Sequence, residues 1–385
     1  MKTAIYLDHA AATPMDEQVA AAMRPYFAEK FYNPSATYLA AASVKADIEK
    51  ARETIAHWLG TRPATLTFTA GGTEANNLAL FGVAGKYRGS HIVSSALEHE
   101  SILKPLERLK QDGHKYTLVA PKSDGVIDPA AVSRAITNRT VLVSIMYANN
   151  EIGTVQPLKD IAALVATERK KRQKTGNLLP LFMHTDACQA AAYLDLHVAR
   201  LGVDLMTING GKIYGPKQSG VLYANSRVGL RPIIFGGGQE LGLRSGTENV
   251  AGAIGVAKAL DLVQNRRQTE RTRLTELQDI FMKELTAQIP SVIINGSLHR
   301  RLPNNVHVTI PNTDNERLVF ALDAAGIQCA AGSACSASKA DASHVLKALG
   351  LSEDKARASL RFTLGFGTTE KDIRAAVSEL VKIVA

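Results

Sequence analysis

The sequence predicts an α/β protein: a large domain with a mostly parallel sheet flanked by helices, and a smaller α/β domain. Short apolar runs alternate with amphipathic stretches over the first two thirds of the chain. From about residue 262 the pattern changes to a long charged helix followed by short strands and helices. We therefore expect a large domain over residues 15–261 and a small domain built from residues 1–14 and 262–385.

The predicted strands of the large domain are short, almost continuously apolar runs, as expected for strands buried on both faces. They cover residues 65–69, 92–95, 117–120, 141–147, 179–183, 203–208 and 221–223. The amphipathic stretch from Ala40 to Leu59 precedes Gly60, which predicts a helix that ends at a glycine cap. A second long helix is expected from Gln264 to Leu285. In such folds ligands bind at the carboxyl ends of the strands.

Composition narrows the class of protein. With 385 residues and 45% apolar side chains the chain can bury a full core, and no run reaches about 18 apolar residues. The N-terminus lacks the apolar stretch of a secretory signal. We therefore expect a soluble, cytoplasmic protein with no membrane partner.

The cysteines and the distribution of charge exclude further classes of protein. Cys188, Cys329 and Cys335 form no C-x-x-C pair, which favours reduced thiols over a disulfide framework. The net charge is +9, but Lys and Arg are spread over the chain apart from dense runs at 168–174 and 266–273. Such runs are typical of solvated helix faces, so no direct nucleic-acid binding is expected. An acidic small molecule or protein remains open as a partner.

Three strand ends carry residues that suit one cofactor. Gly71, Gly72 and Thr73 open a predicted helix and could hold a phosphate on backbone N–H groups. Asp186 follows one predicted strand, and Lys212 follows the next after a glycine turn. Singly, each has an ordinary reading as a turn, a cap or a solvated lysine.

Together the three features meet the needs of pyridoxal 5'-phosphate. This cofactor requires a lysine amine, a carboxylate beside its pyridine nitrogen and an anion site for its phosphate. Asp186 precedes Lys212 by enough chain for one crossover and a strand, so the two could lie on neighbouring strands.

A longer series of motifs resembles the NifS/IscS cysteine desulfurases, in family order over essentially the whole chain. They are LDHAAATP (7–14), NPS (33–35), FTAGGTEANNLAL (68–80), EHESIL (98–103), ANNEIGTVQP (148–157), HTDACQA (184–190), GGKIYGPK (210–217), GGGQELGLRSGTEN (236–249), GSACSAS (332–338), SHVLKALG (343–350) and SLRFTLG (359–365). The resemblance implies a fold-type I pyridoxal phosphate enzyme of the class V aminotransferase family. It further implies a homodimer whose active sites lie at the subunit interface.

The resemblance also assigns roles to individual residues. Lys212 would carry the cofactor, Asp186 would face the pyridine nitrogen, and His99 would stack on the ring and move protons. Arg361, with Asn150, would bind the substrate carboxylate, which suits a planar guanidinium. The other cofactor contacts implied are Gly72, Thr73, Asn150, Gln189 and Asn209, with Thr247 from the neighbouring subunit.

The same resemblance implies a reaction and its partners. L-cysteine would be converted to L-alanine, with its sulfur passed to Cys335 as a persulfide and then to an acceptor protein. That acceptor would be an iron–sulfur scaffold or a tRNA thiolation enzyme. Cys335 lies among very small side chains, which suits a thiol that collects sulfur in one place and presents it in another.

Two positions depart from the family pattern. Gly211 stands where the family has a histidine before the lysine, which removes an imidazole expected near the phosphate. Phe366 stands where the family often has arginine, and the chain stops soon afterwards, so we expect no C-terminal scaffold-binding extension. Weaker cofactor retention, or compensation by backbone N–H groups, would follow from Gly211.

The sequence also fits other functions, but less closely. A selenocysteine lyase or another class V aminotransferase-like enzyme is the main alternative. Ser336 to Lys339 fits S-x-x-K and Lys174 to Gly176 fits K-T-G, but the order is reversed for a penicillin-binding hydrolase and S-D-N is missing. A zinc site at His184, Asp186 and Cys188 lacks a fourth ligand nearby in sequence, and no metal is expected.

Overall fold

The computed structural model describes residues 4–332 and 342–385. Its main feature is a seven-stranded sheet with the strand order β2-β8-β7-β6-β5-β3-β4. The pairs among β3, β4, β5, β6 and β7 are parallel, and β8 is antiparallel to both β7 and β2. The strands are β2 (Leu66–Thr69), β3 (His91–Ser95), β4 (Lys115–Val119), β5 (Thr140–Ser144), β6 (Phe182–Asp186), β7 (Leu205–Asn209) and β8 (Gly220–Ala224). The mostly parallel sheet is thus confirmed.

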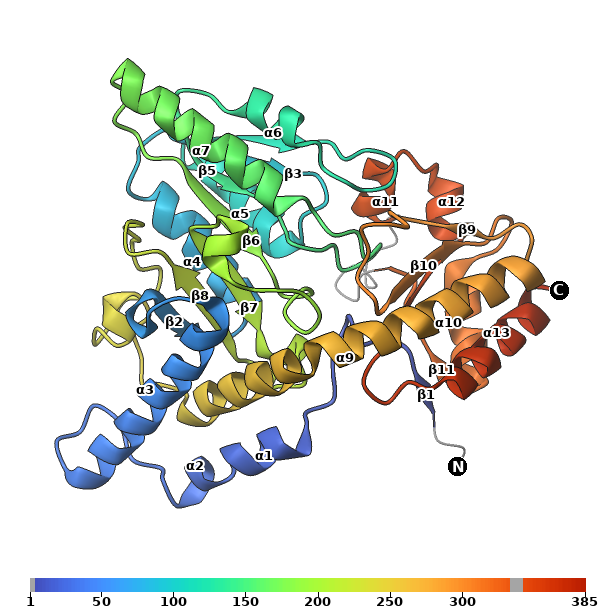
Figure 1. The fold of residues 1–385 in the computed structure, drawn as a ribbon, viewed down its shortest axis with the longest axis horizontal. Coiled ribbons are helices and arrows are strands. Elements are labelled where there is room, and N and C mark those ends of the chain that lie inside the picture. Colours follow the sequence, from blue (N-terminus) through green and yellow to red (C-terminus); the bar gives the residue numbers. More distant parts are fainter. Residues whose placement is uncertain (1–3, 333–341) are drawn as a thin grey trace.

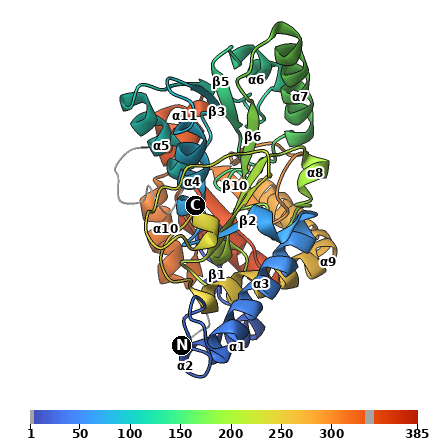
Figure 2. The same ribbon diagram turned by 90° about the vertical axis from the view of Figure 1, so that its left-hand side faces the viewer.

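Helices cover both faces of this sheet because successive strand residues point to opposite sides. Ile92, Leu142 and Phe182 pack with the helices α4 and α5. Their neighbours Val93 and Met183 belong to the core on the other face, with α3, α7, α8 and α9 (Figure 2). The helices around the sheet are α3 (Leu39–Leu59), α4 (Gly72–Ala84), α5 (Glu100–Gln111), α6 (Pro129–Ala135), α7 (Leu158–Thr175), α8 (Val198–Leu201) and α9 (Val250–Gln288).

A second group of elements lies on the other side of the molecule in Figure 1, at the right of the view. Its antiparallel sheet has the order β12-β10-β9, and the N-terminal strand β1 pairs in parallel with β11. These strands are β1 (Ile5–Tyr6), β9 (Ile293–Ile294), β10 (Asn305–Thr309), β11 (Ile327–Gln328) and β12 (Ser359–Thr363). The helices of this group are α10 (Asn315–Ala324), α11 (His344–Ala348), α12 (Glu353–Arg357) and α13 (Glu370–Val384). Helices α1 (Glu17–Met23) and α2 (Pro25–Ala28) lie instead against α9 at the lower left of Figure 1. Short 3-10 turns are η1 (Pro63–Thr65), η2 (Gly210–Lys212) and η3 (Glu240–Gly242).

Helix α9 runs past both groups of elements (Figure 1). It is longer than the helix predicted from Gln264, because it already begins at Val250. The expected boundary between residues 261 and 262 therefore falls inside one continuous helix. The division into domains of residues 15–261 and of 1–14 with 262–385 stays a prediction.

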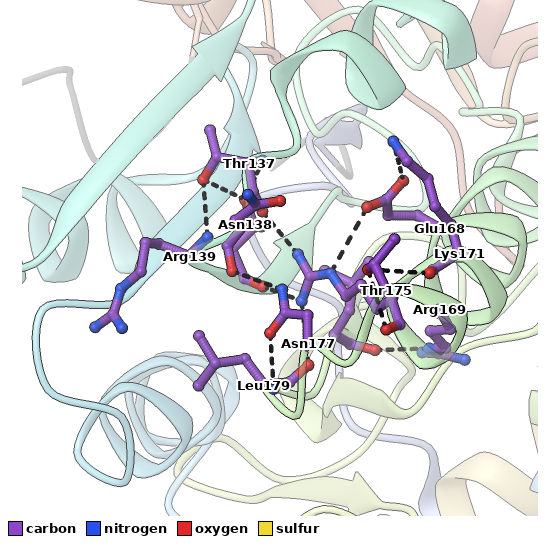
Figure 3. Close-up of polar contacts among 12 residues, drawn as sticks. Thr137, Asn138, Arg139, Glu168, Arg169, Lys171, Thr175, Asn177 and Leu179 are labelled. Carbon is purple, nitrogen blue, oxygen red and sulfur yellow. Dashed lines mark hydrogen bonds and ion pairs between the residues drawn. The ribbon is translucent and has the colours of Figure 1, made fainter.

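Two sequence predictions of single elements can be compared directly. The helix expected over residues 40–59 is α3, and Gly60 caps it in the left-handed conformation with φ 63°. The strand expected from residue 179 begins only at Phe182. The carbonyls of Leu179 and Pro180 accept hydrogen bonds from Arg172 of α7 instead of joining the sheet. Figure 3 shows the neighbouring contacts at this end of α7, among them Asn177 with Asn138.

No helix in the described part of the chain is both long and apolar enough to cross a membrane.

Candidate functional site

A cavity at the carboxyl end of the parallel strands brings most of the predicted site residues together. It encloses about 600 Å³ of empty space, part of which is open to solvent. Its lining includes the predicted residues Gly72, Thr73, His99, Asn150, Asp186, Gln189, Asn209, Lys212 and Arg361. It also includes Asn76, Ser101 and Cys188, for which the sequence predicted no role at the site.

Asp186 and Lys212 lie on neighbouring strand ends, as predicted. Asp186 is the last residue of β6, and its partner in the parallel ladder is Thr207 of β7. Lys212 follows β7 at the end of η2. Its Nζ donates hydrogen bonds to the carbonyls of Ala10, at 2.8 Å, and Ala11. The amine is thus held at the N-terminal segment, which forms one wall of the cavity.

Helix α4 offers an anion site at its first turn. Gly71 precedes it with φ 130°, a conformation that favours glycine. Because glycine has no side chain, no side chain caps the start of the helix. A Cβ on Gly72 would lie 2.7 Å from the Cys188 Sγ, so a larger residue there would force the Cys188 side chain to shift. The uncapped N–H groups and the positive end of the helix dipole favour a phosphate.

His99 caps the start of α5 and is fixed by Ser101. The Ser101 backbone N–H donates to His99 Nδ1 at 3.1 Å, and the Ser101 Oγ lies 2.8 Å from the same nitrogen. Asn76 of α4 continues this contact, since its Nδ2 donates to Ser101 Oγ at 2.8 Å and to Asp186 Oδ2 at 2.7 Å. An unbroken chain of hydrogen bonds therefore joins Asp186 to His99.

Arg361 is almost fully buried on β12 and reaches the cavity from the second group of elements. Its Nη2 donates to Asp8 Oδ1 at 2.6 Å, and its Nη1 donates to the backbone carbonyl of Asn150 at 3.0 Å. Its Nε is buried without a hydrogen-bond partner among the described residues. The guanidinium thus forms a structural ion pair with Asp8 and lines the cavity, and its Nε–H is left without a partner among the described residues.

Two ionisable groups next to the site are kept neutral by burial. Burial raises the pKa of the Glu98 carboxyl to about 8, and the Asp186 charge adds to this. Burial also lowers the pKa of His184 to about 4. Both His184 ring nitrogens already face hydroxyls, Ser144 Oγ at 2.9 Å and Thr207 Oγ1 at 3.1 Å.

The cysteines differ in what the structure describes. Cys188 and Cys329 are free thiols. Burial, reinforced by the Asp186 charge, raises the pKa of Cys188 well above its usual value, and burial raises the pKa of Cys329 to about 12. Cys335 lies outside the described residues, as do Ser336 and Lys339 of the S-x-x-K motif.

The described residues on either side of positions 333–341 contact the site. Ala330 exchanges backbone hydrogen bonds with Arg361. Ser343 donates to Glu151 Oε2 at 2.5 Å, and His344 Nε2 lies 3.0 Å from the carbonyl of Glu98, the residue before His99. Both flanks are therefore anchored at the cavity wall.

Three further residues were predicted to contact the cofactor: Gln189, Asn209 and Thr247. Gln189 lines the cavity, but its Nε2 donates to the Ala10 carbonyl at 3.0 Å. Asn209 accepts a hydrogen bond from the Gly211 N–H at 3.1 Å. Thr247 is exposed and does not line this cavity. Its predicted role was as a residue of the neighbouring subunit, and that role stays a prediction.

The site residues that sequence reasoning missed come from places without a strand-end signal. Asp8 lies in the N-terminal segment, Asn76 in the interior of α4 and Ser101 in the first turn of α5. The motifs FTAGGTEANNLAL and EHESIL contain two of them, but nothing in their spacing shows that they meet.

Known proteins with similar sequences and structures cover nearly all of the chain. The family described as aminotransferase class-V matches residues 5–375. The protein named cysteine desulfurase IscS of Dictyoglomus turgidum is 39% identical over 100% of this chain and 95% of its own length. The Archaeoglobus fulgidus protein named cysteine desulfurase IscS 1 is 38% identical over 96% of this chain and 94% of its own length.

Two solved structures are also similar to this chain over nearly its whole length. A structure titled NifS-like protein superimposes with a TM-score of 0.91 at 30% identity and covers 99% of each chain. A structure titled SspA in complex with cysteine superimposes with a TM-score of 0.80 at 34% identity, over 94% of this chain and 98% of the other.

Proposed function

The chain belongs to the class-V aminotransferase family, and from this premise we propose that it is a pyridoxal phosphate-dependent cysteine desulfurase. It converts L-cysteine to L-alanine and transfers the sulfur to Cys335. The names of the curated relatives support this activity. The single observation that carries it is the meeting of Lys212, Asp186 and the uncapped start of α4 around one cavity.

The described residues fit the cofactor at each of its functional groups. The first turn of α4, with Gly72 and Thr73, suits the phosphate, and Asp186 suits the protonated pyridine nitrogen. Lys212 supplies the amine that binds the cofactor covalently, and His99 supplies a ring for stacking. Asn150, Gln189 and Asn209 provide polar contacts around the remaining edge. Once bound, the cofactor serves as an electron sink for the carbon that bears the substrate amine.

The chain's own residues then have distinct tasks. Lys212 Nζ is the group placed to take a proton from the substrate Cα, because its carbonyl partners at Ala10 and Ala11 hold it at the cavity wall. Arg361 binds the substrate carboxylate, using donors that the Asp8 contact leaves available. Cys335 would attack the substrate sulfur as a thiolate, which forms the S–S bond of a protein persulfide. The substrate C–S bond would break, and its electron pair would stay on the carbon, which takes up a proton to complete the methyl group of L-alanine.

Two observations support Cys335 over the other cysteines as the sulfur acceptor. Burial keeps Cys188 and Cys329 in the thiol form, whereas the nucleophile must be a thiolate. The flanks of the segment 333–341 are anchored beside Arg361 and His99.

The partners belong to the proposal as well. A homodimer would bring Thr247 of one subunit to the phosphate site of the other. There the Thr247 hydroxyl would add a hydrogen-bond donor to the N–H groups at the uncapped start of α4. The names of the IscS relatives favour an iron–sulfur scaffold as the sulfur acceptor, and a tRNA thiolation enzyme is the other candidate. The alternative activity, selenocysteine lyase, is separated by comparing sulfide release from L-cysteine with selenide release from L-selenocysteine.

The test of this function uses the purified protein and two variants. The wild type is expected to be yellow, and borohydride reduction should attach the cofactor to Lys212. Lys212→Ala should lose the colour, whereas Cys335→Ala should keep it and lose at least a hundredfold in alanine and sulfide release. Mass spectrometry of the wild type with L-cysteine should find the persulfide on Cys335.

The matched controls are Cys188→Ala and Cys329→Ala, which should keep most of their activity because the raised pKa values of both thiols disfavour the thiolate. Cofactor attached to another lysine would overturn the role of Lys212. Full turnover in Cys335→Ala, or a persulfide mainly on Cys188 or Cys329, would overturn the sulfur route.

A further inference from the structure

We propose that Asn76 is a positioning residue that orients Asp186 and His99 together, through its two amide hydrogens and the Ser101 hydroxyl. Its importance for the reaction rests on the proposed function, because that function gives Asp186 and His99 their roles. The hydrogen-bond chain itself is independent of it.

The geometry around Asn76 defines its orientation. Its Nδ2 lies 2.7 Å from Asp186 Oδ2 and 2.8 Å from Ser101 Oγ, so both amide hydrogens are used. With the amide turned over, a carbonyl oxygen would face the Asp186 carboxylate, which is repulsive. The Oδ1 is buried without a hydrogen-bond partner among residues 4–332 and 342–385. The site thus tolerates an unsatisfied acceptor in order to keep both donors in place.

Hydrogen bonds are donated outward from Asn76, to Asp186 on one side and through Ser101 to His99 on the other. Since Ser101 Oγ accepts from Asn76, its own proton is left for His99 Nδ1, at 2.8 Å. The Ser101 backbone N–H donates to the same nitrogen at 3.1 Å. His99 Nδ1 is therefore a double acceptor, and the neutral ring carries its hydrogen on Nε2.

Few residue types could donate both hydrogen bonds from the position of Asn76. One nitrogen with two hydrogens can serve two acceptors that lie close together, and among side chains of this size only asparagine offers it without adding a charge. Aspartate has the same shape but only acceptors at neutral pH, so it would oppose Asp186 and take the Ser101 proton for itself. Asn76→Asp therefore separates donation from shape, and Asn76→Ala removes both.

The first measurement uses protein labelled with ¹⁵N-histidine and stripped of cofactor with hydroxylamine. Two-bond ¹H–¹⁵N spectra at pH 7.5 report the ring nitrogens, and the His99 signals are identified by their loss in His99→Asn. The wild type should show His99 with hydrogen on Nε2 and with Nδ1 shifted by its hydrogen bonds. The Nδ1 signal should move toward that of an unbonded nitrogen in Asn76→Asp, Asn76→Ala and Ser101→Ala. Asn77→Ala, one residue further along α4, is the control and should leave it unchanged.

The second measurement is the dissociation constant of pyridoxal phosphate from each reconstituted protein. Both Asn76 variants should bind at least tenfold more weakly, because Asp186 loses a charge-assisted hydrogen bond. Ser101→Ala keeps that bond, so its dissociation constant should stay within threefold of the wild type.

The outcomes separate the two proposals. An unchanged His99 Nδ1 signal in both Asn76 variants, with a changed signal in Ser101→Ala, would mean that Ser101 orients His99 alone and would overturn the inference. Cofactor affinity within twofold of wild type in Asn76→Ala would overturn the part that concerns Asp186. If the wild type bound no cofactor, the proposed function would fail, and the histidine spectra of the stripped protein would still test the chain. Should Asn76→Asp not fold, the histidine spectra and the cofactor dissociation constants of Asn76→Ala and Ser101→Ala still test the inference.

Discussion

Burial controls the chemistry of single residues around the cavity more than neighbouring charges do. Glu98 has no exposed surface, and its Oε1 accepts from the Ser95 hydroxyl at 2.7 Å and the Met146 N–H at 2.9 Å. Its Oε2 has no partner within the described chain. Even with two donors on one oxygen, loss of hydration dominates, and it raises the pKa of this carboxyl to about 8.

The raised pKa of Glu98 predicts a dependence of stability on pH. Between the unfolded pKa near 4.5 and the folded pKa of about 8, the folded protein binds a proton that the unfolded chain releases. Stability from this group is therefore full below pH 4.5 and falls as the pH rises toward 8, by up to about 1.4 kcal/mol per pH unit. Glu98→Gln should gain stability relative to the wild type over this range. Urea unfolding at pH 5, 6, 7 and 8 measures the difference, and a constant gap between the two proteins would contradict it.

Gly211 can be tested as a replacement for the family's histidine. A Cβ at this position would meet its nearest atoms, Asn209 Oδ1 and Lys217 Cγ, at 3.6 Å, which is ordinary contact. Gly211→His should therefore bind pyridoxal phosphate as tightly as the wild type or more tightly, in a dissociation series of the two proteins. Gly72→Ala is the contrasting variant and should bind more weakly, because its methyl group would press on the Cys188 Sγ. A large loss of affinity in Gly211→His would mean that the family geometry does not transfer to this turn.

At the scale of elements, two arginines fasten α7 to the sheet: Arg169 donates to the Leu181 carbonyl and to Asp204, and Arg172 makes the larger set of contacts. Arg172 is buried and donates to the carbonyls of Thr140 and Thr137, both at 2.7 Å, and of Leu179 and Pro180. It thereby joins the last turn of α7 to the turn before β5 and to the stretch before β6. Thr137, Asn138 and Leu179 lie near this end of α7 in Figure 3.

Removing Arg172 should destabilise this end of the protein. Arg172→Ala leaves several carbonyls without a donor, and we expect a loss of about 2–4 kcal/mol in the free energy of unfolding. Lys171→Ala is the neighbouring control, because Lys171 is exposed and its ion pair with Glu168 is a surface contact at 3.6 Å. Its effect should stay within about 0.5 kcal/mol. Urea unfolding measures both, and equal losses would contradict the fastening role.

The sequence predicted the elements well where period and caps agree. All seven strands of the large sheet were expected near their observed positions. The expected burial on both faces is wrong for β4, which is a mostly exposed edge strand. The first third of α9 was missed because Gly252 and Gly255 weaken its helical pattern. A Cβ on Gly255 would lie 2.6 Å from the Met23 Sδ and 2.8 Å from the Pro216 Cγ, so close packing explains this glycine. Such a cause lies in tertiary contacts and cannot be read from local propensity.

The site was predictable to a similar degree. Strand-end residues such as Asp186 and Lys212 were found because a parallel sheet brings its carboxyl ends together. Asn76 and Asp8 were not found, because their roles depend on which helix face and which distant segment meet the cavity. The pairing of Arg361 with Asp8 likewise became visible only in three dimensions.

At the scale of the whole molecule, the N-terminal segment joins the two groups of elements. Strand β1 pairs with β11, and Asp8 binds Arg361 of β12. A few residues later, the carbonyls of Ala10 and Ala11 accept from Lys212 beside the large sheet. One short stretch of chain thus contacts both the small sheets and Lys212.

Breaking the contact between Asp8 and Arg361 should weaken the protein well beyond this segment. Asp8→Ala leaves the Arg361 guanidinium, which is 1% exposed, without its carboxylate, and we expect a loss of about 3–5 kcal/mol in the free energy of unfolding. The control is Asp323→Ala, an exposed aspartate at the end of α10. Its loss should stay within about 0.5 kcal/mol in the same urea titration. Equal effects of the two substitutions would contradict the role of the pair.

The pairing of the first residues with the last strand also sets an order of events during synthesis. Asp8 and Arg361 are 353 positions apart, so Asp8 leaves the ribosome long before its partner exists. At about 5–20 residues per second, the N-terminal segment waits roughly 20–70 seconds. The nascent large sheet can form in that interval, but the wall of its cavity stays open until the end of translation. Cofactor capture in the cell is therefore expected to be a post-translational step.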